Sequence, residues 1–171
     1  QNKEAIQQQL EKMDKSNEDV KKQIDRTLEQ FKQLEVEKRI NEEMSALKKL
    51  AEAQKALAQK TLEKSETKEE LQKQQEAINR KFEELKQEMQ KTEEKNKAQE
   101  SPMNMDDTKQ DQEAIQKSLE ESSESIEKKQ NKKAAEKQKE SADQMEELAE
   151  KMKKSLEKSQ EEQAEEDYYT L

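Results

Sequence analysis

The chain has 171 residues, of which 45% are charged, 27% hydrophobic and 2% aromatic, and its formal net charge is −9. It contains no glycine, cysteine, histidine or tryptophan, and one proline, Pro102. So few apolar side chains exclude the thick core of a compact globular domain, which is usually about 45–50% apolar on a count that includes glycine. Without histidine and cysteine the chain lacks the usual metal ligands, general bases and nucleophiles. We therefore expect no metal and no cofactor.

Two classes of chain fit this composition, an extended helical coiled coil and a disordered polyampholyte. Helix is favoured because Glu, Lys, Gln, Ala and Leu are all strong helix formers and dominate the chain. Apolar side chains also recur at helical spacing along most of the sequence. We predict an all-α fold, an elongated antiparallel helical hairpin or three-helix coiled-coil bundle.

The first predicted helix covers about residues 3–63. Its first half carries apolar residues in alternating steps of four and three, the heptad pattern of a coiled coil. This N-terminal stripe consists of Ile6, Leu10, Met13, Asn17, Val20, Ile24, Thr27, Phe31 and Leu34. Asn17 either fixes the register of a continuous helix, as one buried asparagine can, or marks a break. The unchanged phase favours the continuous helix. After Leu34 the phase slips, and a second stripe starts at Val36.

A second helix is predicted over about residues 68–98. Thr67 followed by Glu70 matches a capping box, in which each side chain satisfies a free backbone N–H of the other residue. The stripe of this helix then runs in steps of four and three without error: Leu71, Gln75, Ile78, Phe82, Leu85, Met89, Thr92 and Asn96. This pattern indicates one buried face along the whole helix.

A third helix is predicted over about residues 107–165. Pro102 disfavours helical geometry just before it, and Asp106 or Asp107 is a suitable N-cap for the third helix. Between residues 127 and 141 the apolar pattern is poor, so we expect this stretch to be a weak point.

Short links favour antiparallel neighbours. We expect the second helix to fold back on the second half of the first, and the third to run beside the second and then beyond it. Residues 1–171 would then form one extended coiled-coil region. The chain begins at Gln1 and both ends resemble internal cuts, so we expect it to be part of a larger protein.

The acidic residues give little sign of an active site. Carboxylates need a dry pocket to shift their pKa values, and we expect a thin bundle to offer none. The cluster of Asp106, Asp107 and Asp111 lacks the alternate ligands and turn glycine of an EF-hand, which indicates helix capping. There is also no glycine-rich phosphate loop. We therefore expect no enzyme and no small-molecule substrate.

Two groups of residues are candidate contacts for a partner. They are a basic cluster, which includes Lys128, Lys129, Lys132 and Lys133, and two methionines in the proline-containing turn, Met103 and Met105. The methionines form either a small apolar plug or a contact with a partner. The cluster would bind an acidic or anionic partner, or it is a solvated helix face with acidic neighbours. The chain is acidic and no aromatic residue lies among these lysines, which argues against nucleic acid. We expect a protein partner or self-association.

A resemblance to one known family is carried by Asp25–Lys38, the turn Pro102–Thr108, and Asn131–Lys139 with Met145–Met152. In the same order, these stretches resemble one group of long, helix-rich, membrane-anchored proteins of unknown function from Bacteroidetes. The resemblance implies an internal coiled-coil region of a bacterial envelope protein, anchored in the inner membrane and lying on the periplasmic side. Any contact with the membrane would then be made by segments outside this chain. The family defines no catalytic residues to transfer.

The leading functional hypothesis is a structural or interaction module, a coiled-coil spacer or docking rod of the envelope. The alternative is a holdase-like chaperone or adaptor that grips partners between helical arms. Exposed apolar residues at the tips of the arms would favour the alternative.

Overall fold

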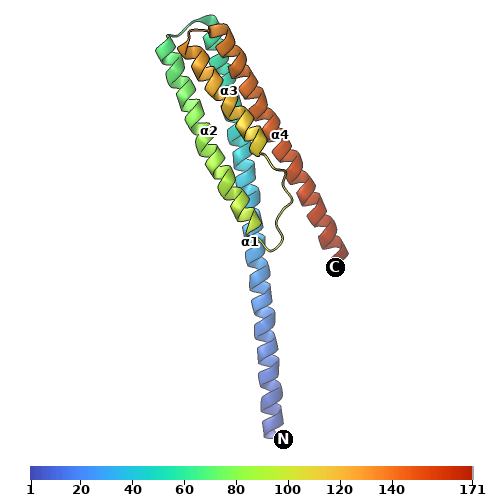
Figure 1. Cartoon of the computed structure of the whole chain (residues 1–171). Helices are drawn as coiled ribbons and strands as arrows, with labels where there is room; N and C mark the ends of the chain where they lie inside the picture. The colour runs from blue at the N-terminus through green and yellow to red at the C-terminus, as the bar shows by residue number, and fades with distance from the viewer. Residues whose placement is uncertain (171) are drawn as a thin grey trace.

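The computed structural model describes residues 1–170 and is all-α, as predicted (Figure 1). It contains α1 (Asn2–Glu63), α2 (Lys68–Lys97), α3 (Lys109–Glu127) and α4 (Asn131–Thr170). The first two helices agree with the expected ranges to within one residue. The chain therefore folds as four packed helices, rather than as the three that we expected.

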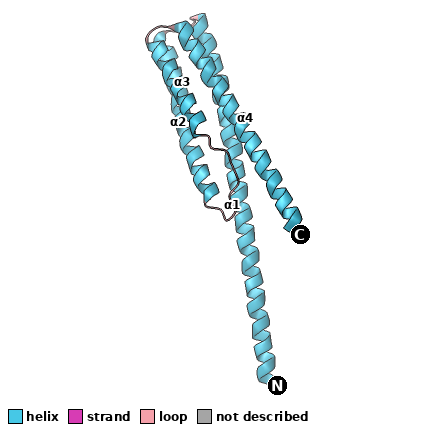
Figure 2. Cartoon of the chain, turned by 45° about the vertical axis from the view of Figure 1, so that its right-hand side comes forward, coloured by secondary structure: helices cyan, strands magenta, loops and turns pink. Residues whose placement is uncertain are grey.

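The helices run alternately up and down and form a four-helix bundle (Figures 1 and 2). Contacts between helices join α1 to α2 and α4, and join α3 to the same two helices. The α1–α2 turn and the α3–α4 turn lie together at one end, where Asn131 Nδ2 donates a hydrogen bond to the Thr61 carbonyl at 3.2 Å. We call this end the tip.

The expected single helix over 107–165 is wrong, because the chain turns at Lys128–Gln130. Lys129 takes the left-handed conformation with φ 56°, and the Gln130 N–H donates to the Ser125 carbonyl at 2.9 Å. Such a bond closes a helix end in which the left-handed residue is usually glycine. Because a lysine occupies that position here, the usual sequence signal is missing. As a consequence, α4 turns back at the tip and runs along α1.

The capping of the helices agrees with the sequence at α2 and differs at α3. At α2 the Thr67 hydroxyl accepts from the Glu70 N–H at 3.2 Å and the Thr67 N–H donates to Glu70 Oε2 at 3.0 Å, which completes the capping box. At α3 the N-cap is Thr108, and its side chain makes no capping bond. Asp107 instead accepts from the Lys109 N–H at 3.0 Å.

The core is a narrow row of side chains between the four helices. All eight stripe residues of α2 are buried, from Leu71 to Asn96. Three glutamines also lie in the core with no exposed surface, Gln54, Gln75 and Gln138. Buried polar side chains are tolerated where they are hydrogen-bonded, and these three are linked to one another.

Residues 98–108, here called the connecting segment, link α2 to α3. They rise along the bundle from the lower end of α2 and fill the place that the shorter α3 leaves open (Figures 1 and 2). The Asn96 side chain fixes the segment, because its Nδ2 donates to the Met103 carbonyl at 2.8 Å and its Oδ1 accepts from the Met103 N–H at 2.9 Å. The Asp106 N–H donates to Ser155 Oγ on α4 at 2.9 Å.

The first half of α1, residues 2–34, is here called the stalk. It continues the axis of α1 well below the bundle, so that the N-terminus lies far from the other helices (Figure 1). Residues 1–28 are all exposed. Packing against the rest of this chain therefore begins only near the end of the stalk.

Candidate functional site

The stalk presents an apolar surface to solvent. Eight large apolar side chains are each 51–65% exposed: Ile6, Leu10, Met13, Val20, Ile24, Leu28, Phe31 and Leu34. All but Leu28 belong to the N-terminal stripe. Contiguous exposed apolar surface of this extent usually marks an interaction site. The stalk is therefore the strongest candidate for a binding surface among the described residues.

The four candidate lysines come together at the tip of the bundle. Lys128 and Lys129 lie in the α3–α4 turn, Lys132 and Lys133 lie in the first turn of α4, and all four are exposed. Lys128 Nζ pairs with Glu124 at 2.5 Å, so the cluster is partly neutralised by its own chain. Whether it contacts a partner stays a prediction.

The two candidate methionines are not both available to a partner. Met103 is 6% exposed and belongs to the core, and Met105 is partly buried against the same core. Met103 therefore packs as an apolar plug of the bundle rather than as an exposed partner contact. The physical reason is that the connecting segment runs along the bundle, where Met103 replaces the apolar contact of a longer α3.

A cavity of about 430 Å³ lies beside the connecting segment. Residues from α1, α2, α4 and the segment line it, among them Ile40, Glu43, Met89, Thr92, Asn96, Met105 and Ser155. Glu43 is 5% exposed, and burial of its carboxylate raises its pKa to about 7. A hydrogen bond from Thr92 and the charge of Arg39 act in the opposite direction. This carboxyl group therefore gains and loses its proton near neutral pH.

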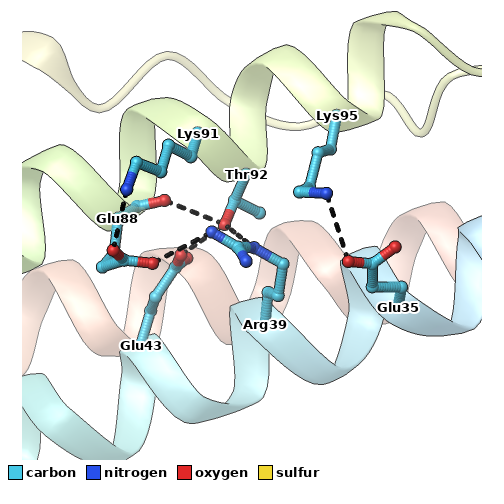
Figure 3. A network of polar contacts seen from close by, with 7 residues as sticks. All are labelled: Glu35, Arg39, Glu43, Glu88, Lys91, Thr92 and Lys95. Carbon is cyan, nitrogen blue, oxygen red and sulfur yellow. Dashed lines mark hydrogen bonds and ion pairs between the residues drawn. The ribbon is translucent and has the colours of Figure 1, made fainter.

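Figure 3 shows the polar contacts around this carboxyl group, which join α1 to α2. The Thr92 hydroxyl accepts from Arg39 Nε at 2.9 Å and is hydrogen-bonded to Glu43. The Arg39 guanidinium also pairs with Glu88 at 3.0 Å. One turn away, Lys95 and Glu35 pair at 3.2 Å. The network fixes the position of Glu43 between the two helices.

The expectation that no carboxylate has a shifted pKa is wrong for Glu43. A signal was present in the sequence, because steps of four and three from Val36 pass through Ile40 and reach Glu43 rather than Met44. Among the described residues of the cavity, Glu43 is the one carboxyl group whose pKa is raised.

Residues 1–170 also lack two further features, a cluster of metal ligands and a helix able to span a membrane. Within this part of the chain no group of three or more acidic side chains is placed to hold a metal ion. None of the four helices described here is both long enough and apolar enough to cross a membrane.

Comparison of the chain with models of known protein families, with curated proteins and with solved structures finds no match.

Proposed function

We propose that this chain is a non-enzymatic structural and interaction module, an extended helical spacer or docking rod of a bacterial envelope protein. The observation that carries the proposal is the stalk, which projects beyond the bundle with its apolar stripe exposed. Side chains of this kind are buried in the core of a self-contained domain, whereas a docking surface keeps them outside. The envelope setting rests on the sequence resemblance.

The two ends of the rod differ in chemistry. The stalk is apolar along one face, whereas the tip carries the exposed lysines Lys128, Lys129, Lys132 and Lys133. The 62 residues of α1 span about 90 Å at the usual rise of 1.5 Å per residue. Such a rod can hold two partners apart. An acidic protein partner at the tip would lose affinity as salt rises, because exposed charges are screened.

The holdase-like alternative meets one expectation, because exposed apolar side chains lie on the stalk and Tyr168 and Tyr169 are exposed near the end of α4. The surfaces of these two arms that face each other give it less support. Below the bundle, the open region between the stalk and the end of α4 is lined by polar side chains, among them Arg26, Glu29, Gln30, Gln33, Gln163 and Asp167. Arms that grip unfolded clients need apolar side chains on their facing surfaces. The apolar side chains of the stalk instead form the stripe, which lies on another face of α1.

The spacer role is tested by measuring whether α1 is one stiff rod in solution. Because the chain has no cysteine, spin labels can be attached at Gln8→Cys and Ser45→Cys, and diluted with unlabelled protein so that distances within one chain dominate. A continuous helix places these positions about 55 Å apart. We expect one narrow distance distribution near that value. A broad distribution, or one centred far below it, would reject the spacer.

A further inference from the structure

We propose that the stalk pairs with the stalk of a second copy of this chain to form a parallel, in-register, two-stranded coiled coil. The proposal deepens the proposed function and rests on it, since it names the partner of the exposed apolar face. Four features of the stalk support this pairing: the length of the stripe, the place of Asn17, the charges beside the stripe, and the position of the bundle relative to the stripe.

The stripe is long enough for a stable pair. It follows the heptad pattern, with Leu10, Asn17, Ile24 and Phe31 at positions a, and Ile6, Met13, Val20, Thr27 and Leu34 at positions d. Apolar a and d positions sustained over about three to four heptads indicate a coiled coil. The stripe spans residues 6–34, which is about four heptads.

Asn17 favours two parallel strands in one register. In a parallel pair each a residue faces the same residue of the other strand, so Asn17 meets a second Asn17 and the two amides can bond to each other. A single asparagine at an a position selects register and number of strands in this way, at a cost in stability. In an antiparallel pair a residues face d residues, so Asn17 would face Val20 or Thr27.

The residues beside the stripe carry no charge conflict in this arrangement. A parallel pair brings each g residue next to the e residue five positions later on the other strand. These pairs are Gln9 with Asp14, Ser16 with Lys21, Gln23 with Leu28, and Gln30 with Glu35. None of them joins two like charges. The residues at positions e and g therefore cause no charge repulsion between two paired stalks.

The bundle does not obstruct a second stalk. Leu34 is the last residue of the stripe and is 59% exposed, whereas Val36 is 1% exposed in the core. Side chains two positions apart in an α-helix, such as Leu34 and Val36, point about 160° away from each other. The stripe and the core therefore lie on opposite faces of α1. A symmetric pair joined through the stripe would therefore carry its two bundles on the outside.

Contacts made by the rest of the chain agree with this geometry. Gln33 exchanges hydrogen bonds with Gln163 of α4, and Glu29 accepts one from the Glu100 N–H at 3.3 Å. Gln33 and Glu29 are each two residues from Phe31, and so also lie about 160° from it. The stripe face of the stalk is left open. Beyond Leu34 the same face carries Lys38, Asn41 and Ser45, all exposed, so the paired region ends where the bundle begins.

The mass of the full chain in solution gives the first test. We expect sedimentation or light scattering at about 100 µM to give twice the 20.2 kDa of one chain, with dissociation on dilution. A mass of one chain at that concentration, or of three, would overturn the proposal.

Paired variants test whether the stripe is the interface. Leu10→Glu combined with Ile24→Glu places two carboxylates in the seam, and we expect the dissociation constant to rise more than about a hundredfold. The matched control, Ala5→Glu with Gln8→Glu, adds the same charge at outward positions and should leave the constant within about threefold. Circular dichroism and hydrogen exchange of α2 verify that the bundle is intact. If the dissociation constant of the Leu10→Glu, Ile24→Glu variant equals that of the wild type, the interface lies elsewhere.

Cross-linking tests the orientation. Met13→Cys sits at a d position, so mild oxidation with copper phenanthroline should join the two chains by a disulfide in a parallel, in-register pair. Lys12→Cys points outward and is the matched control, with little cross-link expected. Asn17→Val should lower the yield at Met13→Cys, because it removes the residue that selects the register. A dimer that gives no cross-link at Met13→Cys contradicts the parallel register.

Failure of the pairing proposal can be distinguished from failure of the proposed spacer role. The spin-label distance between Gln8→Cys and Ser45→Cys reports one diluted chain, whereas mass and cross-linking report two chains. A stiff monomeric rod rejects the pairing and retains the spacer. A dimer with a flexible stalk rejects the spacer.

Discussion

The side-chain amides of Gln54 on α1 and Gln75 on α2 exchange two hydrogen bonds, of 3.3 and 3.1 Å, at the centre of the bundle. Gln54 also donates to Ser141 at 3.0 Å, and Gln138 donates to Gln75 at 3.0 Å. Gln75 Nε2 also donates to Asn79, and Asn79 donates to Ser123 of α3, each at 2.9 Å. Side chains of all four helices therefore meet in one polar layer. Such a layer fixes which residues face one another, because any shift along the helices would leave buried amides unpaired.

Removal of one member of this layer should destabilise the bundle. Gln75→Leu leaves the Gln54 and Gln138 amides buried with fewer partners, and we expect the free energy of unfolding to fall by about 1–3 kcal/mol in urea titrations. Gln90→Leu, at an exposed position of the same helix, is the control and should change it by less than about 0.5 kcal/mol. Unchanged or greater stability of Gln75→Leu would show that the polar layer is dispensable.

Glu43 should make stability depend on pH in a particular direction. Its pKa is raised from 4.5 to about 7, so the folded protein holds this proton more tightly than the unfolded chain. The contribution of Glu43 to stability is then fully present below about pH 4.5 and declines until about pH 7. At pH 8, Glu43→Gln should be more stable than the wild type by a few kcal/mol at most.

The difference between wild type and Glu43→Gln must be compared at each pH. Other carboxyls contribute in the opposite direction, such as Glu121, whose pKa is lowered by its hydrogen bond with Lys137. Glu42→Gln, at the exposed neighbouring position, is the control and should leave the slope between pH 4.5 and 7 intact. If Glu43→Gln follows the wild type at every pH, the carboxylate is not held in a desolvated site.

Asn96 should determine whether the connecting segment stays on the bundle. Asn96→Ala removes both hydrogen bonds to the Met103 backbone, which leaves buried polar groups without partners and costs about 1–3 kcal/mol. Amide hydrogen exchange in residues 99–108 should become faster, and proteolysis should cut there. Asn104→Ala, at an exposed position of the segment, is the control. Equal protection in both variants would mean that apolar packing of Met103 alone holds the segment.

The capping box should stabilise the start of α2. Thr67→Ala removes the acceptor for the Glu70 N–H and should lower the free energy of unfolding by about 1 kcal/mol. Thr67→Ser keeps the hydroxyl and should recover most of the loss. Hydrogen exchange from residue 64 to residue 71 locates the effect. A loss of the same size in Thr67→Ser would assign it to the methyl group instead.

Much of the secondary structure and of the core can be predicted from the sequence alone. The step pattern from Leu71 to Asn96 identified every buried residue of α2, and the same rule continued from Val36 would have found Glu43. This is possible because 3.6 residues per turn place every third or fourth side chain on one face, whatever the neighbouring helix is. Propensity and periodicity are local properties, so they identify α1 and α2 directly.

The pairing of helices was decided only by the tertiary structure. The turn at Lys129 uses a left-handed lysine, which carries no sequence signal, and without it α4 cannot return along α1. The stripes of α2, α3 and α4 resemble one another, so spacing alone does not tell which stripe meets which. The sequence also showed the slip between Leu34 and Val36. It did not show that the stripe before the slip is exposed and the stripe after it is buried in the core. The bundle occupies one face of α1 and leaves the other face of the stalk open, because a helix can bury only the face that its neighbours reach.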